Sequence, residues 1–117
     1  MSHLTNHVQL IGHLGQDPEF ITFDNGNNLC KISVAVNEYY KDKAGNKQTN
    51  TSWHRVVSWG KTAELMNQLL KKGSKVALTG KMVRRDYEDK SGNTRYIVEV
   101  QADQFLNLSP VNEKVAV

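Results

Sequence analysis

Aromatic and basic side chains alternate along the segment 51–59. Trp53, Arg55 and Trp59 are separated by even numbers of residues, and Val57 occupies the position between the last two. In a β-strand such residues project from one face, because successive side chains alternate across the strand. Unpaired bases can stack on flat rings while a guanidinium meets a phosphate, so the pattern indicates a platform for single-stranded nucleic acid. The other interpretation places both tryptophans in the core, where the arginine between them would need a buried partner.

Two further clusters combine bases with aromatic rings. One shares a strand face and consists of Lys81, Arg85 and Tyr87; the other consists of Tyr39, Tyr40, Lys41 and Lys43. The first cluster is accompanied by Asp86, Glu88 and Asp89, so a solvated arm held by salt bridges is an equal interpretation of it. The three clusters together extend the predicted binding surface beyond a single strand.

The charge distribution points to the same part of the chain. The net charge is only +3, but residues 31–95 hold 14 of the 15 basic residues and six of the 12 acidic ones. A basic region of this kind favours a polyanionic partner, although a solvated basic face without a partner would have the same composition.

Composition and motifs argue against an enzyme. Gly60-Lys61-Thr62 resembles the end of a phosphate-binding P-loop, but the glycine required upstream would fall at Arg55. The four histidines and the single cysteine are too scattered to predict a zinc site, and no Ser–His–Asp or paired-carboxylate pattern stands out. We therefore expect no catalysis, no metal and no cofactor.

The location is predicted from what the sequence lacks. Cys30 is the single cysteine, so no internal disulfide can form and a reducing compartment is favoured. No apolar stretch approaches the ~18 residues of a membrane span, and the first ten residues lack the basic region of a secretory signal. These features predict a cytoplasmic protein, associated with the nucleoid if it binds DNA.

The elements that must position the clusters are mostly strands. Hydrophobic alternation predicts long strands around residues 8–14, 30–36, 51–59, 76–82 and 96–102, and a short one over 19–23. One helix is predicted over 62–72, with Lys71 and Lys72 in its last turn and Gly73 as its left-handed cap. The polar segment 41–50 reads as an exposed loop.

This order of elements predicts an all-β fold with one short helix. A five-stranded Greek-key barrel of the oligonucleotide-binding (OB) type, with the helix between strands three and four, fits best. An SH3-like barrel is the second choice, because an eleven-residue helix is long for that fold. We expect one OB-fold domain over residues 1–109 and a short flexible end over 110–117.

Three motifs resemble the bacterial single-stranded DNA-binding proteins. The first is the run from Val8 to Glu19, VQLIGHLGQDPE; the second is WHRVV at 53–57 with Gly60-Lys61; the third is Lys72-Gly73-Ser74 with Val76 and Gly80. The similarity extends from about Asn6 to Leu108, and three separate motifs in the right order are a specific signal.

The resemblance implies a role and a set of site residues. It implies an OB barrel, usually a homotetramer, that coats single-stranded DNA during replication, recombination and repair. Bases would stack on Tyr40, Trp53, Trp59 and Tyr87, and phosphates would meet Lys43, Arg55, Lys61, Lys72 and Arg85. His54 would lie at a subunit contact.

The end of the sequence departs from the family pattern. Family members usually continue into a long flexible tail with an acidic tip that recruits repair enzymes, whereas this sequence ends at Val117 without such a tip. Recruitment through a tail is therefore not expected of it. The rival interpretation is an OB-fold interaction module, an accessory subunit of a replication-restart complex in which DNA contact is secondary.

Overall fold

The computed structural model describes residues 5–109 of the chain. Its elements are β1 (Val8–Leu14), β2 (Glu19–Thr22), β3 (Asn28–Lys41), β4 (Lys47–Trp59), α1 (Gly60–Leu69), β5 (Lys75–Glu88) and β6 (Thr94–Asn107). The expected flexible end over 110–117 lies outside the described residues. Within the described part, no helix is long and apolar enough to cross a membrane.

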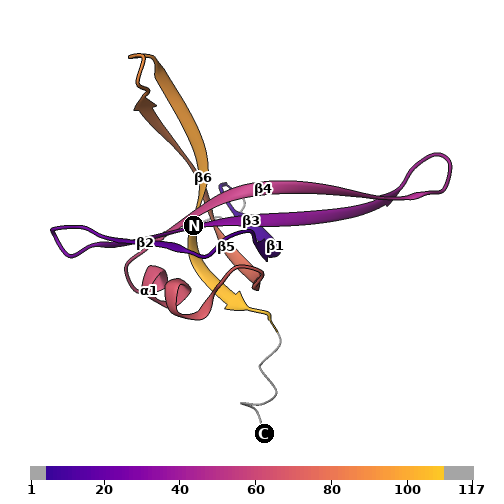
Figure 1. The fold of residues 1–117 in the computed structure, drawn as a ribbon, viewed down its shortest axis with the longest axis horizontal. Helices are drawn as coiled ribbons and strands as arrows, with labels where there is room; N and C mark the ends of the chain where they lie inside the picture. The colour runs from indigo at the N-terminus through magenta and orange to yellow at the C-terminus, as the bar shows by residue number, and fades with distance from the viewer. Residues whose placement is uncertain (1–4, 110–117) are drawn as a thin grey trace, which may run out of the picture.

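The strands close into a barrel (Figure 1). They form one sheet in the order β1-β5-β6-β4-β3-β2, and β1 also pairs with β3 through His13 with Ala35 and Leu14 with Val34. This extra pairing joins β1, β5, β6, β4 and β3 in a ring, while β2 pairs with β3 at its side. The predicted OB-type barrel is confirmed, with the helix between its third and fourth strands.

The inward faces of the strands meet in one apolar core. Val34, Val56 and Val76 come from three different strands and are completely or almost completely buried. The helix adds Ala63 and Met66, which are also inaccessible, as it packs against β3 and β4. Each such burial stabilises the fold by roughly 1.5–3 kcal/mol for a Val- or Met-sized side chain, so the barrel gives the surface residues a rigid support.

The helix differs from its prediction at both ends. It begins at Gly60, two residues early, because Gly60 takes φ +65° and lets β4 turn directly into the helix. It ends at Leu69, because Leu70 returns to an extended conformation with φ −108° and ψ 150°. Lys71 therefore lies beyond the last helical turn, and Gly73 serves the following turn instead of capping the helix: its N–H donates to the Leu14 carbonyl oxygen at 2.9 Å.

Two hairpins extend from the barrel as arms (Figure 1). In the first arm β3 and β4 stay paired out to Lys41 and Lys47, and in the second β5 and β6 stay paired out to Glu88 and Thr94. The expected loop over 41–50 is therefore only five residues long. Both arms end in the same pattern, Asp-Lys-x-Gly-Asn, at 42–46 and 89–93.

The leading aspartate holds each of these turns together. The Asp42 carboxylate accepts the backbone N–H groups of Ala44 and Asn46, each at 2.9 Å. These hydrogen bonds lower the Asp42 pKa below its ordinary value, and the bond from the Asn46 backbone is the largest cause. Asp89 makes the same contacts in the second arm, where a hydrogen bond from Arg95 is the largest cause of its lowered pKa.

Candidate nucleic-acid interface

Strand β4 presents both tryptophans on the outside of the barrel. In the β3–β4 register Trp53 lies opposite Ala35 and Arg55 opposite Ser33, and these small partners leave the large side chains uncovered. Trp53 is 60% exposed and Trp59 is 45% exposed. The interpretation that places both tryptophans in the core is therefore wrong, and Val56, on the other face, fills the core instead.

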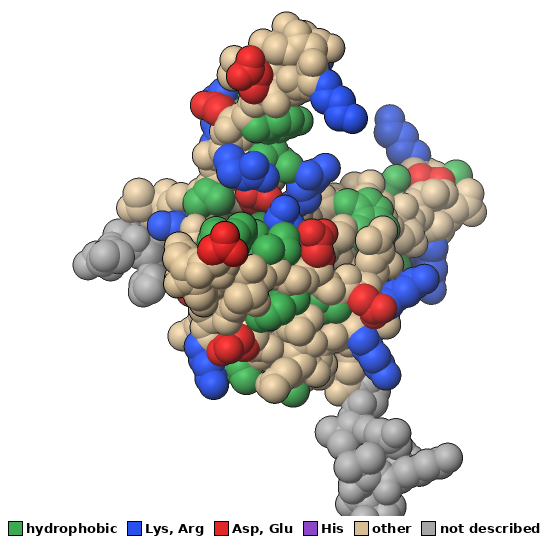
Figure 2. Space-filling model, turned by 60° about the vertical axis from the view of Figure 1, so that its left-hand side comes forward, with side chains coloured by type: hydrophobic (Ala, Val, Ile, Leu, Met, Phe, Trp, Pro, Cys, Tyr) green, Lys and Arg blue, Asp and Glu red, His purple; other side chains and the backbone are tan. Residues whose placement is uncertain are grey.

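The outer faces of β4 and the β5–β6 arm meet at a cleft. The parallel pairing of Val57 with Gln101 brings β4 beside β6. A cleft of about 310 Å³ lies there, and Arg55, Arg85, Lys31 and Glu99 are among its lining residues. Blue basic, red acidic and green apolar side chains lie together where the upper projection leaves the body (Figure 2). Residues from several strands thus meet at the cleft, where the basic Lys31, Arg55 and Arg85 lie beside the acidic Asp17, Glu19 and Glu99.

The two arginines of the cleft differ in their partners. Arg85 Nε lies 3.4 Å from Glu99 Oε1, and the Glu99 side chain is only 8% exposed. Among residues 5–109, Arg55 makes no hydrogen bond or ion pair. Arg55 is therefore the freer of the two to meet an external anion.

The remaining predicted aromatics lie on the arms. Tyr39 and Tyr40 leave β3 on alternate sides, yet both border one hollow with Lys41 and Lys47. Tyr87 lies on the same face of β5 as Arg85, because two residues separate them. All three tyrosines are exposed.

The other predicted basic residues are spread over the surface. Lys43 lies in the turn at the tip of the first arm, Lys61 in the first turn of α1, and Lys72 just after the helix. The backbone N–H of Lys72 donates to Asp17 Oδ1 at 2.8 Å, and Asp17 also lines the cleft. The structure thus brings Arg55 and Arg85 together at the cleft but not these three lysines.

His54 lies apart from this surface. It is opposite the core residue Val34 in the β3–β4 register, on the reverse side of β4 from Trp53, and is partly buried.

Sequence reasoning missed three residues of the surface. Lys31 and Glu99 line the cleft, and the Phe23 ring stacks on Trp59 with centroids 6.0 Å apart and an interplanar angle of 25°. For Phe23 a signal existed, since Glu19, Ile21 and Phe23 alternate along a short strand. For Glu99 none did, because its partner Arg85 is distant in sequence.

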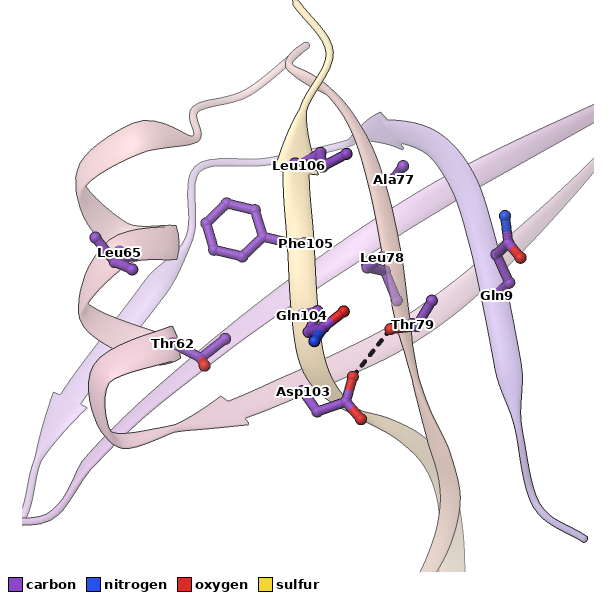
Figure 3. A pocket seen from close by; sticks show the side chains of 10 residues that line it. All are labelled: Gln9, Thr62, Leu65, Ala77, Leu78, Thr79, Asp103, Gln104, Phe105 and Leu106. Carbon is purple, nitrogen blue, oxygen red and sulfur yellow. Dashed lines mark hydrogen bonds between the residues drawn. The ribbon is translucent and has the colours of Figure 1, made fainter. Parts of the chain in front are cut away.

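A second cavity can be set aside as the nucleic-acid site. It has a volume of about 510 Å³ and lies between α1 and strands β5 and β6, with Leu65, Phe105 and Leu106 among its lining residues (Figure 3). Lys and Arg do not line it, and Asp103, held by a hydrogen bond from Thr79 at 2.9 Å, is its charged member. Such a groove does not suit a polyanion.

Metal and thiol chemistry find no support in the described residues. Within 5–109 no group of three His, Cys, Asp or Glu side chains could hold a metal ion. Cys30 is buried in the core, and this burial raises its thiol pKa to about 11.

Comparison with known proteins identifies the family. Residues 5–108 match the single-strand binding protein family. The chain is 42% identical over 101 residues to single-stranded DNA-binding protein 1 of Chlorobaculum tepidum, covering 86% of this chain and 62% of that relative. It is also 42% identical over 113 residues to the protein of the same name from Xylella fastidiosa, covering 94% of this chain and 83% of that one.

Solved structures agree on the fold. A deletion mutant of the single-stranded DNA-binding protein from Thermus aquaticus aligns with a TM-score of 0.77 at 27% identity, covering 89% of this chain and 50% of that one. The Plasmodium falciparum protein solved with single-stranded DNA aligns with a TM-score of 0.80 at 24% identity, covering 89% and 95% of the two chains. The family is one of binding proteins, as the absence of catalytic motifs predicted. By sequence and by fold, this chain belongs to the single-strand binding protein family.

Proposed function

We propose that this chain binds single-stranded DNA largely without regard to sequence. Bases stack on the outward rings of Trp53 and Trp59, and on Tyr40 and Tyr87 of the arms. Stacking contributes about 1–3 kcal/mol per base and tolerates any base, because every base has a flat face. Paired bases cannot reach these rings, so duplex DNA is excluded.

The basic residues supply the second part of the mechanism. Arg55 and Arg85 at the cleft, Lys43 at the tip of the first arm, Lys61 in α1 and Lys72 just after the helix meet phosphates and release condensed counterions. Binding then weakens as salt rises, with a slope that counts the phosphates neutralised. By covering single strands in this way, the chain serves DNA replication, recombination and repair, and acts in the cytoplasm at the nucleoid.

One observation carries the proposal: two tryptophans stand exposed on the face that also holds the arginine cleft. Exposed indoles are costly unless something covers them. An interaction module with only secondary DNA contact would not need two exposed tryptophans beside Arg55, which is unpaired within the described part of the chain, so that alternative is not favoured.

Fluorescence titration with oligo-thymidine tests the function directly. Trp53 and Trp59 are the two tryptophans of the chain, so stacking on them should quench most of the emission. Duplex of the same length is the matched ligand control and should leave the emission nearly unchanged. Unquenched emission and no affinity for oligo-thymidine at low salt would refute the proposal. Oligo-uridine of equal length measures the preference between DNA and RNA.

We also propose that the chain self-associates, as a homotetramer, through the outward face of β1, β5 and β6. Ile11 lies beside Ala77, and Ala77 beside Leu106, in the registers of these strands. Ile11 and Leu106 are both exposed, and such a patch needs a partner. We propose that His54, on β4, lies at a different subunit contact of the tetramer. Sedimentation equilibrium should give a multiple of the chain mass for the natural protein and a smaller one for Leu106→Asp; a monomer in both would rule the assembly out.

A further inference from the structure

Phe23 shares the exposed surface with Trp59 but has no part in the platform described so far. The two rings are stacked, with centroids 6.0 Å apart and planes 25° from parallel. Phe23 is 42% exposed, close to the value for Trp59. Both rings therefore keep substantial area open to solvent even though each covers part of the other.

The register of β2 and the stack on Trp59 together place Phe23 on the outer face that holds the cleft. Ile21 lies opposite Leu29, and Leu29 lies opposite Trp59, so these positions share one face of the sheet. Two residues before Ile21, Glu19 lines the cleft, and two residues after it comes Phe23. The exposed aromatic surface thus continues from β4 across β3 to the β2–β3 turn, seen at the free end of β2 in Figure 1.

Core packing does not account for the position of Phe23. Its neighbour Phe20 is the β2 side chain that packs against the core cluster, whereas Phe23 is outside that cluster. Leu29, which lies between Ile21 and Trp59 in the strand registers, is buried with Phe23 in place. A phenylalanine that served only to cover Leu29 would be replaceable by any apolar side chain of similar size.

The backbone holds Phe23 ready for contact. Its N–H donates to the Asn27 carbonyl oxygen at 2.8 Å, and its carbonyl oxygen accepts the Gly26 N–H at 2.9 Å. These bonds fix Phe23 at the base of a tight turn whose Gly26 takes φ +88°. A ring that is ordered before binding loses little conformational entropy when a base stacks on it.

We propose that Phe23 is a further base-stacking residue, which extends the nucleotide path beyond Trp59 by one contact. The inference rests on the proposed function. It places one end of the nucleotide path at the β2–β3 turn. A strand that runs from the arms past Trp53 and the cleft reaches Trp59 and then Phe23. Short oligonucleotides that end before this point do not use the ring.

A length series of oligo-thymidines tests this role. Phe23→Leu keeps an apolar side chain at this position but removes the flat ring, and Phe23→Trp restores one. For oligonucleotides long enough to span the platform, Phe23→Leu should weaken binding about 5- to 10-fold and Phe23→Trp should bind as the natural protein does. For the shortest oligonucleotides that still bind, all three proteins should have the same affinity.

Tyr96→Leu is the matched control. Tyr96 is an even more exposed aromatic than Phe23, but it lies on the face of the β5–β6 arm opposite Arg85 and Tyr87. The Arg84 guanidinium lies over its ring, 4.2 Å from the centroid. This variant should leave the length series unchanged.

The possible results separate the two proposals. If the natural protein fails to bind any oligo-thymidine, the proposed function is wrong and the inference falls with it. If the natural protein binds and Phe23→Leu has the same affinity at every length, the function stands and the role of Phe23 is refuted. An equal loss at every length, with a lowered melting temperature, would also refute it, because that pattern belongs to a packing residue.

Discussion

The indole of Trp53 lies directly against Gly15, where a Cβ atom would come within 2.5 Å of Cζ3 of the ring. Gly15 is held in place by its own N–H, which donates to the Ser33 carbonyl oxygen at 3.0 Å. One side of the ring is therefore supported by backbone, while much of the ring remains exposed. Gly15, which follows β1, therefore sets the position of the Trp53 ring, the first of the proposed stacking surfaces.

Gly15→Ala should weaken DNA binding without unfolding the protein. The new methyl group displaces the Trp53 ring, which can move because it lies at the surface. We expect oligo-thymidine affinity to fall about 3- to 10-fold, since part of one stacking contact is lost. The melting temperature should change little, and the emission of the free protein should shift to the red as the indole gains solvent.

Gly12→Ala is the control for this substitution. A Cβ at Gly12 would meet the backbone carbonyl of Ala35 across the pairing that closes the barrel, and backbone cannot rotate away. We expect this variant to lose stability by about 1–3 kcal/mol or more. If Gly15→Ala lowers the melting temperature as much as Gly12→Ala does, the supporting role of Gly15 is wrong.

The two cleft arginines should differ in their contribution to salt dependence. Arg55 makes no ion pair within the described residues, whereas Arg85 is already paired with Glu99. Arg55→Ala should therefore reduce the slope of log affinity against log salt by about 0.7, the value for one phosphate on a single strand. Arg85→Ala should reduce it by clearly less. Titrations at several salt concentrations measure both slopes, and equal reductions would contradict the argument.

The shared face of Trp53, Arg55 and Trp59 was predictable because strand alternation is a local property. Whether that face pointed outward was not, since both sides of β4 carry apolar residues. The pairing with β3 decides which face is exposed, because the small residues Ser33 and Ala35 lie opposite Arg55 and Trp53. Sequence alone does not give that register.

Long-range pairs and polar strands escaped prediction for different reasons. The Phe23–Trp59 stack and the Arg85–Glu99 pair join residues far apart in the chain, so no spacing reveals them. The prediction of a loop over 41–50 is wrong for residues 47–50, which belong to β4. Both faces of the strand are exposed there, so the sequence has no hydrophobic alternation that would indicate a strand.

Cys30 should be inert toward thiol reagents in the folded protein. Its side chain is buried, and this burial raises the thiol pKa to about 11, so the reactive thiolate is scarce at pH 8. We expect Ellman's reagent to label no thiol until denaturant is added, and then one per chain. Bound oligo-thymidine should not change the labelling rate, since Cys30 faces the core. Rapid labelling of the folded protein would show that the barrel opens at β3.

The turns that close the two arms should loosen in acid, because each depends on an ionised aspartate. Asp42 and Asp89 have pKa values lowered below the ordinary 3.8. Because each carboxyl has a lower pKa in the folded protein than in the unfolded chain, its ionised form stabilises the turn. This stabilisation is fully present above the pKa of the unfolded chain, near pH 4, and is lost as the pH falls through the pKa of the folded protein. NMR titration of the Asn46 and Asn93 amides, which donate to these carboxylates, should follow both transitions.

Arg95→Ala separates the two turns. Arg95 Nε lies 2.9 Å from Asp89 Oδ2 and is the largest cause of that lowered pKa, whereas the Asp42 pKa is lowered mainly by the backbone of Asn46. The variant should raise the transition followed at Asn93 toward pH 4 and leave that at Asn46 unchanged. Because each lowered pKa has its own local cause, a shift at both turns would mean that the arms are electrostatically coupled, contrary to this account.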